Sequence, residues 1–444
     1  MIKRSWAPRG GRGARFLALC TCLVLPIAAP ADTAQPLPDP LTLNHALSLA
    51  DEAEHPDLAR ALATRDRARA GRLDARARTG LEASLIAGAR VVGPSELSPD
   101  NNRDSVEDHL AGIVVRKNLY DFGRSRGALS AADAALHGSE LAYLDARQQR
   151  RLEIMRHYFD VLLADLQFTR DNEDMAVVFV ALDRLRDRHE LGQVSDVDLL
   201  EHESRFQNIR ARRIESQHRQ RTSRARLAAV LGRPGQLPAN LAVPNLALQR
   251  ELPELEELEQ SVREHNLTLR ALRAEVDAAR ERVSAARAGR RPRLDAELEA
   301  FHYERPLSGR DEWRAGVVLE VPLATGGRVA AQVAQQNAEL ARLRAELHAH
   351  DLALRQQVLE LYLELEHLQA RRQEMNVLRD YRALYLDRSR ALYEMEVRTD
   401  LGDSMVRVSE AELARAEVDF QLAQAWARLD ALTGAMPLPE EAIR

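Results

Sequence analysis

Two spacings of apolar residues alternate along the chain, one typical of long helices and one typical of strands. The clearest helical series steps by three, four or seven residues: Leu340, Leu343, Leu347, Leu354, Val358, Leu361, Leu365, Leu368 and Met375. A second series has the same spacing: Leu152, Met155, Phe159, Leu162 and Leu166. A period near 3.5 sustained this long predicts helices that pack against neighbouring helices in coiled coils.

Four shorter segments alternate apolar and polar residues with a period of two. The expected strands lie at about residues 81–91, 109–119, 294–303 and 312–323. Each has about ten residues, the length of a tilted strand that crosses a bilayer with one face to lipid and the other to a water-filled lumen. A soluble sandwich would show the same alternation, so the pattern by itself leaves both architectures open.

Aromatic residues lie near the ends of these expected strands. We expect them to form an aromatic belt at the membrane boundaries: Tyr120, Phe122, Phe301, Tyr303 and Trp313. Four strands cannot close a membrane barrel, because the smallest such barrels have about eight strands. Strands that span a membrane would therefore require several chains to share one barrel.

The sequence contains an internal repeat. Residues 111–124 (AGIVVRKNLYDFGR) resemble residues 315–328 (AGVVLEVPLATGGR) at an offset of 204, and the same offset relates 195–196 (SD) to 399–400 (TD). Two distant landmarks with one offset predict an internal duplication. The predicted parts are a first repeat (32–232), a Pro-rich linker (233–251), a second repeat (252–434) and a C-terminal tail (435–444).

Each repeat has the same predicted order of elements, in a chain that is mainly α with β. A helix (44–78 or 255–289) is followed by a strand pair, a very long helix (123–189 or 327–393) and a final helix (195–232 or 399–434). The short connection between the last two helices predicts an antiparallel hairpin. Gly123, Gly327 and Pro322 mark the strand-to-helix junctions.

Aspartates follow both predicted hairpin turns. Asp196 and Asp198 come after Ser195, and Asp400 and Asp403 come after Thr399. Such residues cap helices, because their side chains accept free backbone N–H groups and their charge faces the positive end of the helix dipole. All four residues lie at the predicted hairpin tips, where they are helix caps or have another role.

The first 31 residues are predicted to be a secretory signal. A basic stretch precedes the apolar run 16–29, and 29–31 (APA) supplies small residues for cleavage. Both cysteines, Cys20 and Cys22, lie within it, so the mature chain is expected to lack thiol chemistry and disulfides. Loss of five basic residues would take the net charge from −5 to −10, which argues against a nucleic-acid partner.

The remaining sequence offers no convincing catalytic or metal site. His348 and His350 are two residues apart on a predicted helix and so face different directions. His189-Glu190 lacks the second histidine of a zinc-protease motif. We therefore expect no enzyme activity, no cofactor and no metal.

Several segments together resemble the TolC family of outer-membrane efflux proteins. They are LTLNHALSLADEAEHPDL (41–58), NLYDFGR (118–124), GQVSDVDLL (192–200) and VPLATGGR (321–328). The resemblance covers about residues 41–434 in the correct order and twice over. No single motif is strongly specific, whereas the duplicated order is.

The resemblance implies a homotrimer in the Gram-negative outer membrane that extends into the periplasm. Each chain would give four strands to a twelve-stranded transmembrane β-barrel, and its helices would form a long coiled-coil α-barrel. The channel would serve tripartite efflux or type I secretion as a passive exit duct, with a periplasmic adaptor (membrane fusion) protein and an inner-membrane transporter as partners. It would be gated at the periplasmic helical tip.

The resemblance also implies that aspartates after the second hairpin turn narrow the aperture. Aligned on 398–399 (RT), the family's two ring positions fall on Gly402 and Met405, with Asp400 and Asp403 close by. The alternative interpretation of the chain is a soluble periplasmic coiled-coil adaptor or scaffold protein. An adaptor would have one hairpin flanked by β-domains of its own, whereas this chain has two hairpins and short strand pairs. The transported substrate is not encoded in a recognisable motif.

Overall fold

The computed structural model describes residues 36–51, 55–92, 106–304, 311–395 and 401–435. The chain divides into two units, Met1–Pro36 and Leu37–Arg444, and every element below belongs to the second. The predicted signal segment, Asp400 and nearly all of the predicted tail lie outside the described residues.

Helices dominate the described residues, which confirms the prediction of a mainly helical chain. The α-helices are α1 (Leu43–Ser48), α2 (Pro56–Ala77), α3 (Arg124–Glu190), α4 (Asp196–Val230), α5 (Leu255–His265), α6 (Leu267–Arg287), α7 (Arg328–Glu394) and α8 (Leu401–Leu432). The two longest, α3 and α7, have 67 residues each. At 1.5 Å per residue each spans about 100 Å. Two 3₁₀ turns, η1 (Leu49–Asp51) and η2 (Ala288–Arg290), follow α1 and α6.

The four predicted strands are present, and they form one antiparallel sheet. They are β1 (Leu81–Gly88), β4 (Leu110–Tyr120), β5 (Arg293–Tyr303) and β6 (Trp313–Glu320), in the order β1-β4-β5-β6. The central pair, β4 and β5, joins the two halves of the chain, and β1 and β6 are the edges. Two short strands, β2 (Val91–Val92) and β3 (Val106–Glu107), pair with each other in a separate two-stranded sheet.

The prediction of one continuous helix before each strand pair was wrong. In the first half, α2 begins at Pro56, which has no N–H to donate and is suited to the first position of a helix. In the second half, Asn266 separates α5 from α6, and its side chain accepts the backbone N–H of Leu269 at 2.9 Å. The breaks fall at the related sequences 54–56 (EHP) and 264–266 (EHN).

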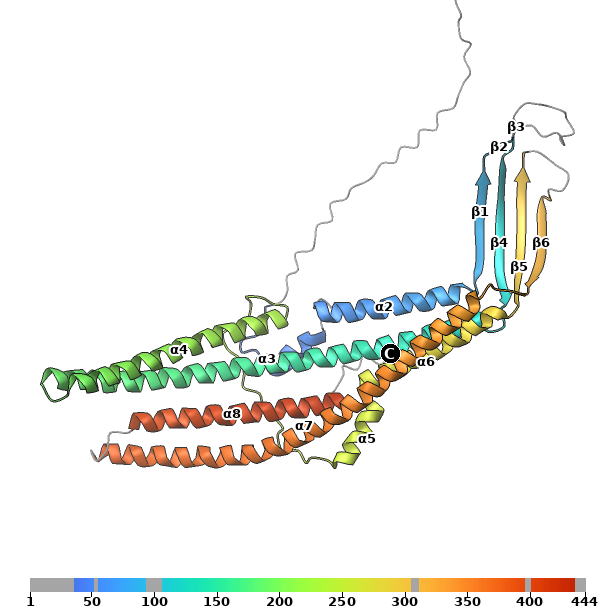
Figure 1. The fold of residues 1–444 in the computed structure, drawn as a ribbon. Coiled ribbons are helices and arrows are strands. Elements are labelled where there is room, and N and C mark those ends of the chain that lie inside the picture. The colour runs from blue at the N-terminus through green and yellow to red at the C-terminus, as the bar shows by residue number, and fades with distance from the viewer. Residues whose placement is uncertain (1–35, 52–54, 93–105, 305–310, 396–400, 436–444) are drawn as a thin grey trace, which may run out of the picture. The chain divides into compact units, whose positions relative to one another are not determined.

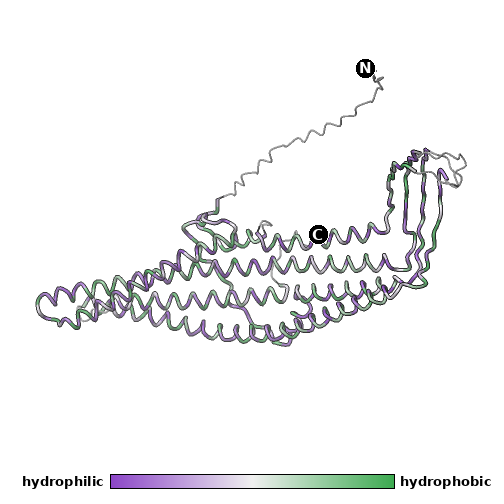
Figure 2. Tube along the Cα trace, turned by 45° about the horizontal axis from the view of Figure 1, so that its top comes forward, coloured by the Kyte–Doolittle hydropathy of each residue, from purple (hydrophilic) through white to green (hydrophobic). Residues whose placement is uncertain are grey.

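The helices lie side by side, with α3 in contact with several neighbours. Near the sheet, α3 packs against α2 and α6, and α6 packs against α7; farther along, α3 packs against α4 and α8, and α8 against α7 (Figure 1). The pairs α3–α4 and α7–α8 are the two predicted antiparallel hairpins. Along both, hydrophobic and hydrophilic positions alternate, as the heptad pattern predicts (Figure 2).

The main apolar core lies where the chain's first segment and its linker cross the middle of the long helices. Phe159 of α3 stacks on Phe420 of α8, with ring centroids 4.5 Å apart. The hydroxyl of Tyr158 lies 2.7 Å from the carbonyl oxygen of Leu41 and 2.6 Å from that of Ala242. Burial raises the pKa of Tyr158 to about 12, so its hydroxyl stays a neutral donor that ties these two segments to α3.

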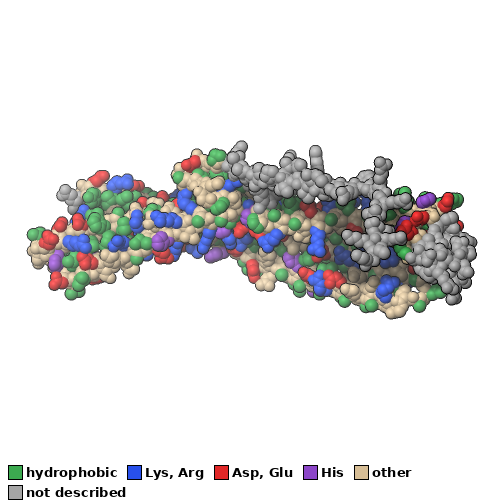
Figure 3. Space-filling view, turned by 90° about the horizontal axis from the view of Figure 1, so that it is seen from above, with side chains coloured by type: hydrophobic (Ala, Val, Ile, Leu, Met, Phe, Trp, Pro, Cys, Tyr) green, Lys and Arg blue, Asp and Glu red, His purple; other side chains and the backbone are tan. Residues whose placement is uncertain are grey.

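Outside this core the helical surface is strongly charged. Basic and acidic side chains are interspersed over the face that Figure 3 shows. Many form ion pairs along one helix or between neighbours, such as Arg372–Asp419 at 2.8 Å between α7 and α8. No helix in the described part of the chain is long and apolar enough to cross a membrane.

The start of α2 predicts a pH-dependent stability. The Nδ1 atom of His55 accepts the backbone N–H of Asp57 at 3.4 Å, which only the neutral ring can do. Burial, with the charge of Arg150, lowers the pKa of His55 below its usual 6.5. The stability that the neutral His55 side chain contributes is therefore present above pH 6.5 and is lost as pH falls through the lowered pKa.

In His55→Asn the cap is retained by a side chain that does not titrate. We expect the fall in thermal midpoint between pH 7.5 and pH 5.5 to be smaller in this variant than in the wild type, by the equivalent of about 1 kcal/mol. Equal falls in the two proteins would show that the His55 cap does not carry the pH dependence.

Candidate functional site

The predicted functional residues lie at opposite ends of the long helices. The aspartates lie where α3 turns into α4 and where α8 begins, and the junction residues lie where β4 and β6 lead into α3 and α7. The heptad spacing of apolar residues keeps α3 and α7 continuous over 67 residues each, and this length separates the two groups of residues.

The first hairpin tip is closed by its own hydrogen bonds. After α3 ends, Gly192 takes a positive φ of 72° that reverses the chain. The hydroxyl of Ser195 accepts the backbone N–H of Asp198 at 3.2 Å and donates to its carboxylate at 2.7 Å. The carboxylate of Asp196 lies 2.7 Å from Nε2 of His189. In this structure both aspartates stabilise the turn and the start of α4.

The second hairpin tip differs from the first in the part that the structure describes. Asp400 lies outside the described residues. Asp403 is exposed in the first turn of α8 and makes no hydrogen bond or ion pair with the residues that the structure describes. It lines a polar groove of about 940 Å³ between the hairpins, together with Arg212 of α4 and Tyr381 of α7.

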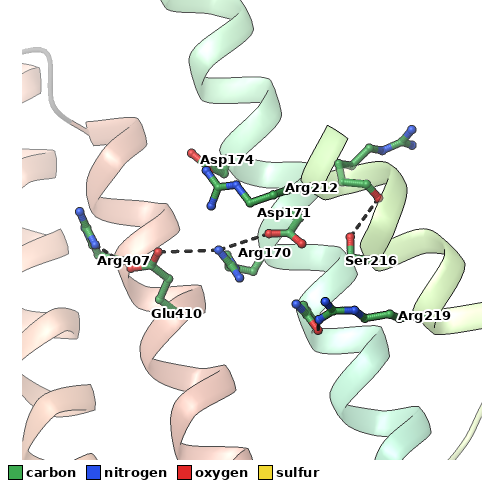
Figure 4. A network of polar contacts seen from close by, with 10 residues as sticks. Arg170, Asp171, Asp174, Arg212, Ser216, Arg219, Arg407 and Glu410 are labelled. Carbon is green, nitrogen blue, oxygen red and sulfur yellow. Dashed lines mark hydrogen bonds and ion pairs between the residues drawn. The ribbon is translucent and has the colours of Figure 1, made fainter. Parts of the chain in front are cut away.

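The hairpins meet along α3 and α8 through polar contacts that the sequence analysis missed (Figure 4). Arg170 of α3 lies 3.2 Å from Asp171 and 4.0 Å from Glu410 of α8, which also pairs with Arg407 at 2.9 Å. Nearby, the hydroxyl of Ser409 donates to Glu173. Charged residues within the helical series could have indicated such polar contacts. The sequence does not show, however, which neighbouring helix each charged residue contacts.

A close approach lies next to these contacts, at one of the two positions implied for the aperture. Gly402 at the start of α8 packs on Val177 of α3, and a Cβ at position 402 would lie 3.0 Å from both γ-carbons of that valine. The other position, Met405, is exposed. Gly402 thus serves the contact between the hairpins and offers no side chain to a ring.

The strand-to-helix junctions share one backbone conformation. Gly123 and Gly327 precede α3 and α7 with φ values of 99° and 80°, which L side chains rarely adopt. Phe122 has a φ of 52°, where the second half has Gly326 at 56°. The guanidinium of Arg291 donates to the carbonyl oxygen of Phe122 at 2.8 Å and ties the two halves together.

The register of the sheet separates its residues into an apolar face and a charged face. Ala83, Val115, Leu298 and Ala315 are paired across the four strands and represent the apolar face. The neighbouring positions bear ion pairs, including Arg116–Glu297 at 2.6 Å, Arg293–Glu320 at 2.8 Å and Arg314–Glu299 at 3.7 Å. One face is therefore suited to lipid and the other to water.

The same register divides the five aromatic residues of the expected belt. Trp313 pairs with Ala300, and Tyr120 pairs with Leu294 after a β-bulge, so both belong to the apolar face at opposite ends of the sheet. Phe301 and Tyr303 stack on each other 5.7 Å apart on the charged face. Phe122 lies in the turn and contacts Tyr120 edge to face at 4.7 Å.

Both halves of the chain match one known protein family. Residues 49–233 and 258–435, which take in both hairpins and all four strands of the sheet, match the outer membrane efflux protein family. The chain belongs to this family. The assignment to TolC-like efflux proteins made from the sequence is thereby confirmed, and with it the outer membrane as the location.

Individual efflux proteins are more distant. The chain is 27% identical over 228 residues to the outer membrane protein TolC of Vibrio cholerae, covering 49% of this chain and 51% of that protein. It is 27% identical over 270 residues to protein CyaE of Bordetella pertussis, covering 59% and 56%. The chain thus spans about half the length of the curated relatives it matches.

Solved structures extend the likeness in fold over nearly the whole chain. The outer membrane protein VceC of Vibrio cholerae has a TM-score of 0.70 and 20% identity, covering 89% of this chain and 95% of that one. Efflux proteins of this family are channels, so the expectation that the chain is not an enzyme is also confirmed. Within the described ranges, no three His, Cys, Asp or Glu residues are placed to hold a metal ion.

The close approach of Gly402 and Val177 can be tested directly. Gly402→Ala would push the start of α8 away from α3, at a local cost of about 1–3 kcal/mol. We expect faster amide hydrogen exchange in residues 401–410. Adding Val177→Ala should restore slow exchange, because it removes both methyl groups that the new Cβ meets.

Gly71→Ala is the matched control, because a Cβ at this helical position of α2 would meet nothing within 4 Å. Exchange in residues 401–410 should be unchanged in this variant. The close-packing argument fails if Gly402→Ala exchanges like the wild type, or if Val177→Ala does not rescue it.

Proposed function

We propose that the chain is the exit duct of a tripartite efflux or type I secretion system, working as a homotrimer and as a passive conduit. The observation that carries this proposal is the family match over both halves, together with a sheet that has one apolar and one charged face. A soluble adaptor or scaffold, the alternative interpretation of the sequence, has no use for an exposed apolar sheet face at the end of a charged helical body.

The open edges of the sheet support assembly into a shared barrel. Among the described residues β1 pairs only with β4, and β6 only with β5, so each edge strand leaves one row of backbone N–H and C=O groups without strand partners there. In a bilayer each unpaired group costs several kcal/mol, by rough estimate. Three copies side by side would pair every edge and give twelve strands, within the size range of known transmembrane barrels.

The helices carry a matching unpaired surface, which we call the α7 outer stripe. It consists of exposed apolar residues at heptad spacing on the side of α7 away from its buried residues: Leu352, Leu359, Leu363, Val377 and Leu384. The opposite edge of the hairpin region is α4, where Val197 and Leu200 are exposed as well. In the proposed trimer the α7 outer stripe of one copy packs on the α2–α4 edge of the next as a coiled coil.

The apolar face of the sheet indicates where the membrane boundaries lie. Trp313 marks one end, and Tyr120 marks the end next to the helices, where Lys117 also projects from the apolar face. Amphipathic aromatic rings and long cationic side chains favour the headgroup region. We propose that these three residues anchor the sheet, whereas Phe301 and Tyr303 face the lumen of the channel.

We further propose that the gate lies at the periplasmic tips and opens by separation of the hairpins along α3 and α8. The contact there includes the Arg170–Glu410 pair and the Gly402–Val177 approach, and it is less apolar than the core around Phe159. A periplasmic adaptor and an inner-membrane transporter are the partners that such a duct requires. The transporter would supply the energy and select the substrate.

The trimer can be tested through the α7 outer stripe. Val377→Asp with Leu384→Asp places two charges where the neighbouring copy would pack, and we expect the detergent-extracted protein to lose its trimeric mass in light scattering. Ala383→Asp is the control. It adds a charge at an exposed position that is about 100° around the helix from Leu384, so the trimer should persist.

Fractionation of the expressing cells completes this test. A trimer recovered from the outer membrane agrees with the shared barrel. A soluble monomer or dimer in the periplasm would exclude the channel and favour the adaptor. A trimer that survives both charges on α7 would exclude the α7 outer stripe as the interface between copies.

The role of the aspartates at the second hairpin tip can also be tested. Three copies of each carboxylate at a narrow mouth would concentrate negative potential and favour cations. We therefore expect Asp400→Ala with Asp403→Ala to lower the ratio of potassium to chloride permeability in planar bilayers. An unchanged ratio would leave these residues as helix caps only, like Asp196 and Asp198 at the first tip.

A further inference from the structure

A cavity of about 800 Å³ lies where the sheet meets the helices. The end of α2, the starts of α3 and α7 and the segment after α6 surround it, and the charged face of all four strands forms one wall. Six arginines line it: Arg78, Arg116, Arg124, Arg291, Arg293 and Arg328. The whole chain has a net charge of −5, so this concentration of positive charge differs from the protein's average.

The acidic residues of the cavity neutralise only part of this charge. Glu297 pairs with Arg116 at 2.6 Å. Glu320 and Asp295 both pair with Arg293, at 2.8 Å and 3.1 Å. These three carboxylates are thus engaged with two guanidinium groups that already belong to the sheet.

Two other carboxylates line the cavity. Asp121 accepts the backbone N–H of Ser125 at 2.8 Å and so caps the start of α3. Glu82 lies opposite Arg116 on the neighbouring strand and adds to the negative charge around that arginine. Neither carboxylate makes an ion pair with the arginines at the helix starts among the described residues.

Three guanidinium groups of the cavity therefore form no ion pair with a carboxylate in the described part of the chain. Arg291 donates to the carbonyl oxygen of Phe122, a neutral acceptor. Arg124 and Arg328 are exposed and make no hydrogen bond or ion pair with side chains in the described part of the chain. Arg78 is bound to Asp74 at 2.9 Å and does not add to this set.

Arg124 and Arg328 hold equivalent positions in the two repeats, 204 residues apart. Each is the first residue of a 67-residue helix and follows a glycine of positive φ. The shared turn brings both side chains to the same cavity, although they are far apart in sequence. In the proposed trimer six such guanidinium groups would surround the conduit at one level.

We propose that this cavity is an anion-binding subsite of the conduit, which takes small solutes with a carboxylate or phosphate group. Guanidinium groups present planar pairs of N–H donors that match the oxygens of these groups. The proposal rests on the proposed function, because it requires the charged face of the sheet to line a lumen. Headgroup phosphates of lipid are the other source of this chemistry, but lipid would cover the opposite, apolar face.

The subsite can be tested on the purified full-length protein in planar bilayers of neutral lipid, with inorganic phosphate as the probe. Arg124→Gln with Arg328→Gln should lower the ratio of chloride to potassium permeability, by about threefold for charges within one Debye length of the permeating ions. Phosphate at millimolar concentration should reduce the chloride current of the wild type, and this effect should be lost in the variant.

Arg126→Gln is the control for Arg124→Gln alone. Arg126 is exposed on the same turn of α3 but does not line the cavity, so its loss removes one charge per chain without changing the subsite. We expect Arg126→Gln to keep the permeability ratio and the phosphate effect. The phosphate measurement on the wild type needs no variant to fold, and an absence of any phosphate effect there would overturn the proposal.

The outcomes separate the subsite from the channel itself. A variant that conducts with an unchanged permeability ratio overturns the subsite and leaves the proposed function intact. A wild-type protein that forms no channel overturns the proposed function, and the subsite with it. If the phosphate effect is replaced by a dependence on phosphatidylglycerol in the bilayer, the arginines bind lipid and the subsite proposal is wrong.

Discussion

The packing of α3 against its neighbours is the interaction that holds both halves of the chain together. This helix contacts α2 and α6 near the sheet and α4 and α8 farther along, so it links both repeats. Tyr158 and Phe159 at its middle are fully buried, the first against the carbonyl groups of the opening segment and the linker, the second against Phe420. In proteins most of the stability of a helix comes from such packing. The heptad spacing of its apolar residues keeps the two ends in fixed relation to one core.

The chain places different chemistry at the two ends of its helices. At the sheet, register alone separates an apolar face from one crossed by ion pairs such as Arg116–Glu297. Where α3 and α8 meet near the second hairpin, the contact includes the Arg170–Glu410 ion pair and the close approach of Gly402 to Val177. These polar groups are only partly exposed, whereas the core around Phe159 consists of buried apolar side chains that each contribute about 1.5–3 kcal/mol. The contact between the hairpins is therefore more polar at this end than at the core.

The two halves of the chain are alike in backbone and different in side chains. Phe122 and Gly326 share one left-handed turn, although only glycine adopts it without strain. The first tip uses Ser195, Asp198 and His189 in a closed network, whereas Asp403 at the start of α8 has no partner among the described residues. Equivalent positions are thus free to diverge in function once the fold is secured by the core that both halves share.

The sequence by itself determined the elements, because heptad and two-residue periods report directly which side of a helix or strand is buried. It also determined the repeat, the caps at Ser195 and the glycines before α3 and α7, since each of these depends on neighbours in the chain. Only the tertiary structure decided which strands pair, that Phe301 and Trp313 lie on opposite faces, and that Arg124 and Arg328 share a cavity. Those facts depend on contacts between residues far apart in the chain, and no local pattern specifies the partner. The helix breaks at Pro56 and Asn266 were predictable only in part. Both residues are visible in the sequence, but whether they interrupt a helix depends on how the segments on either side pack.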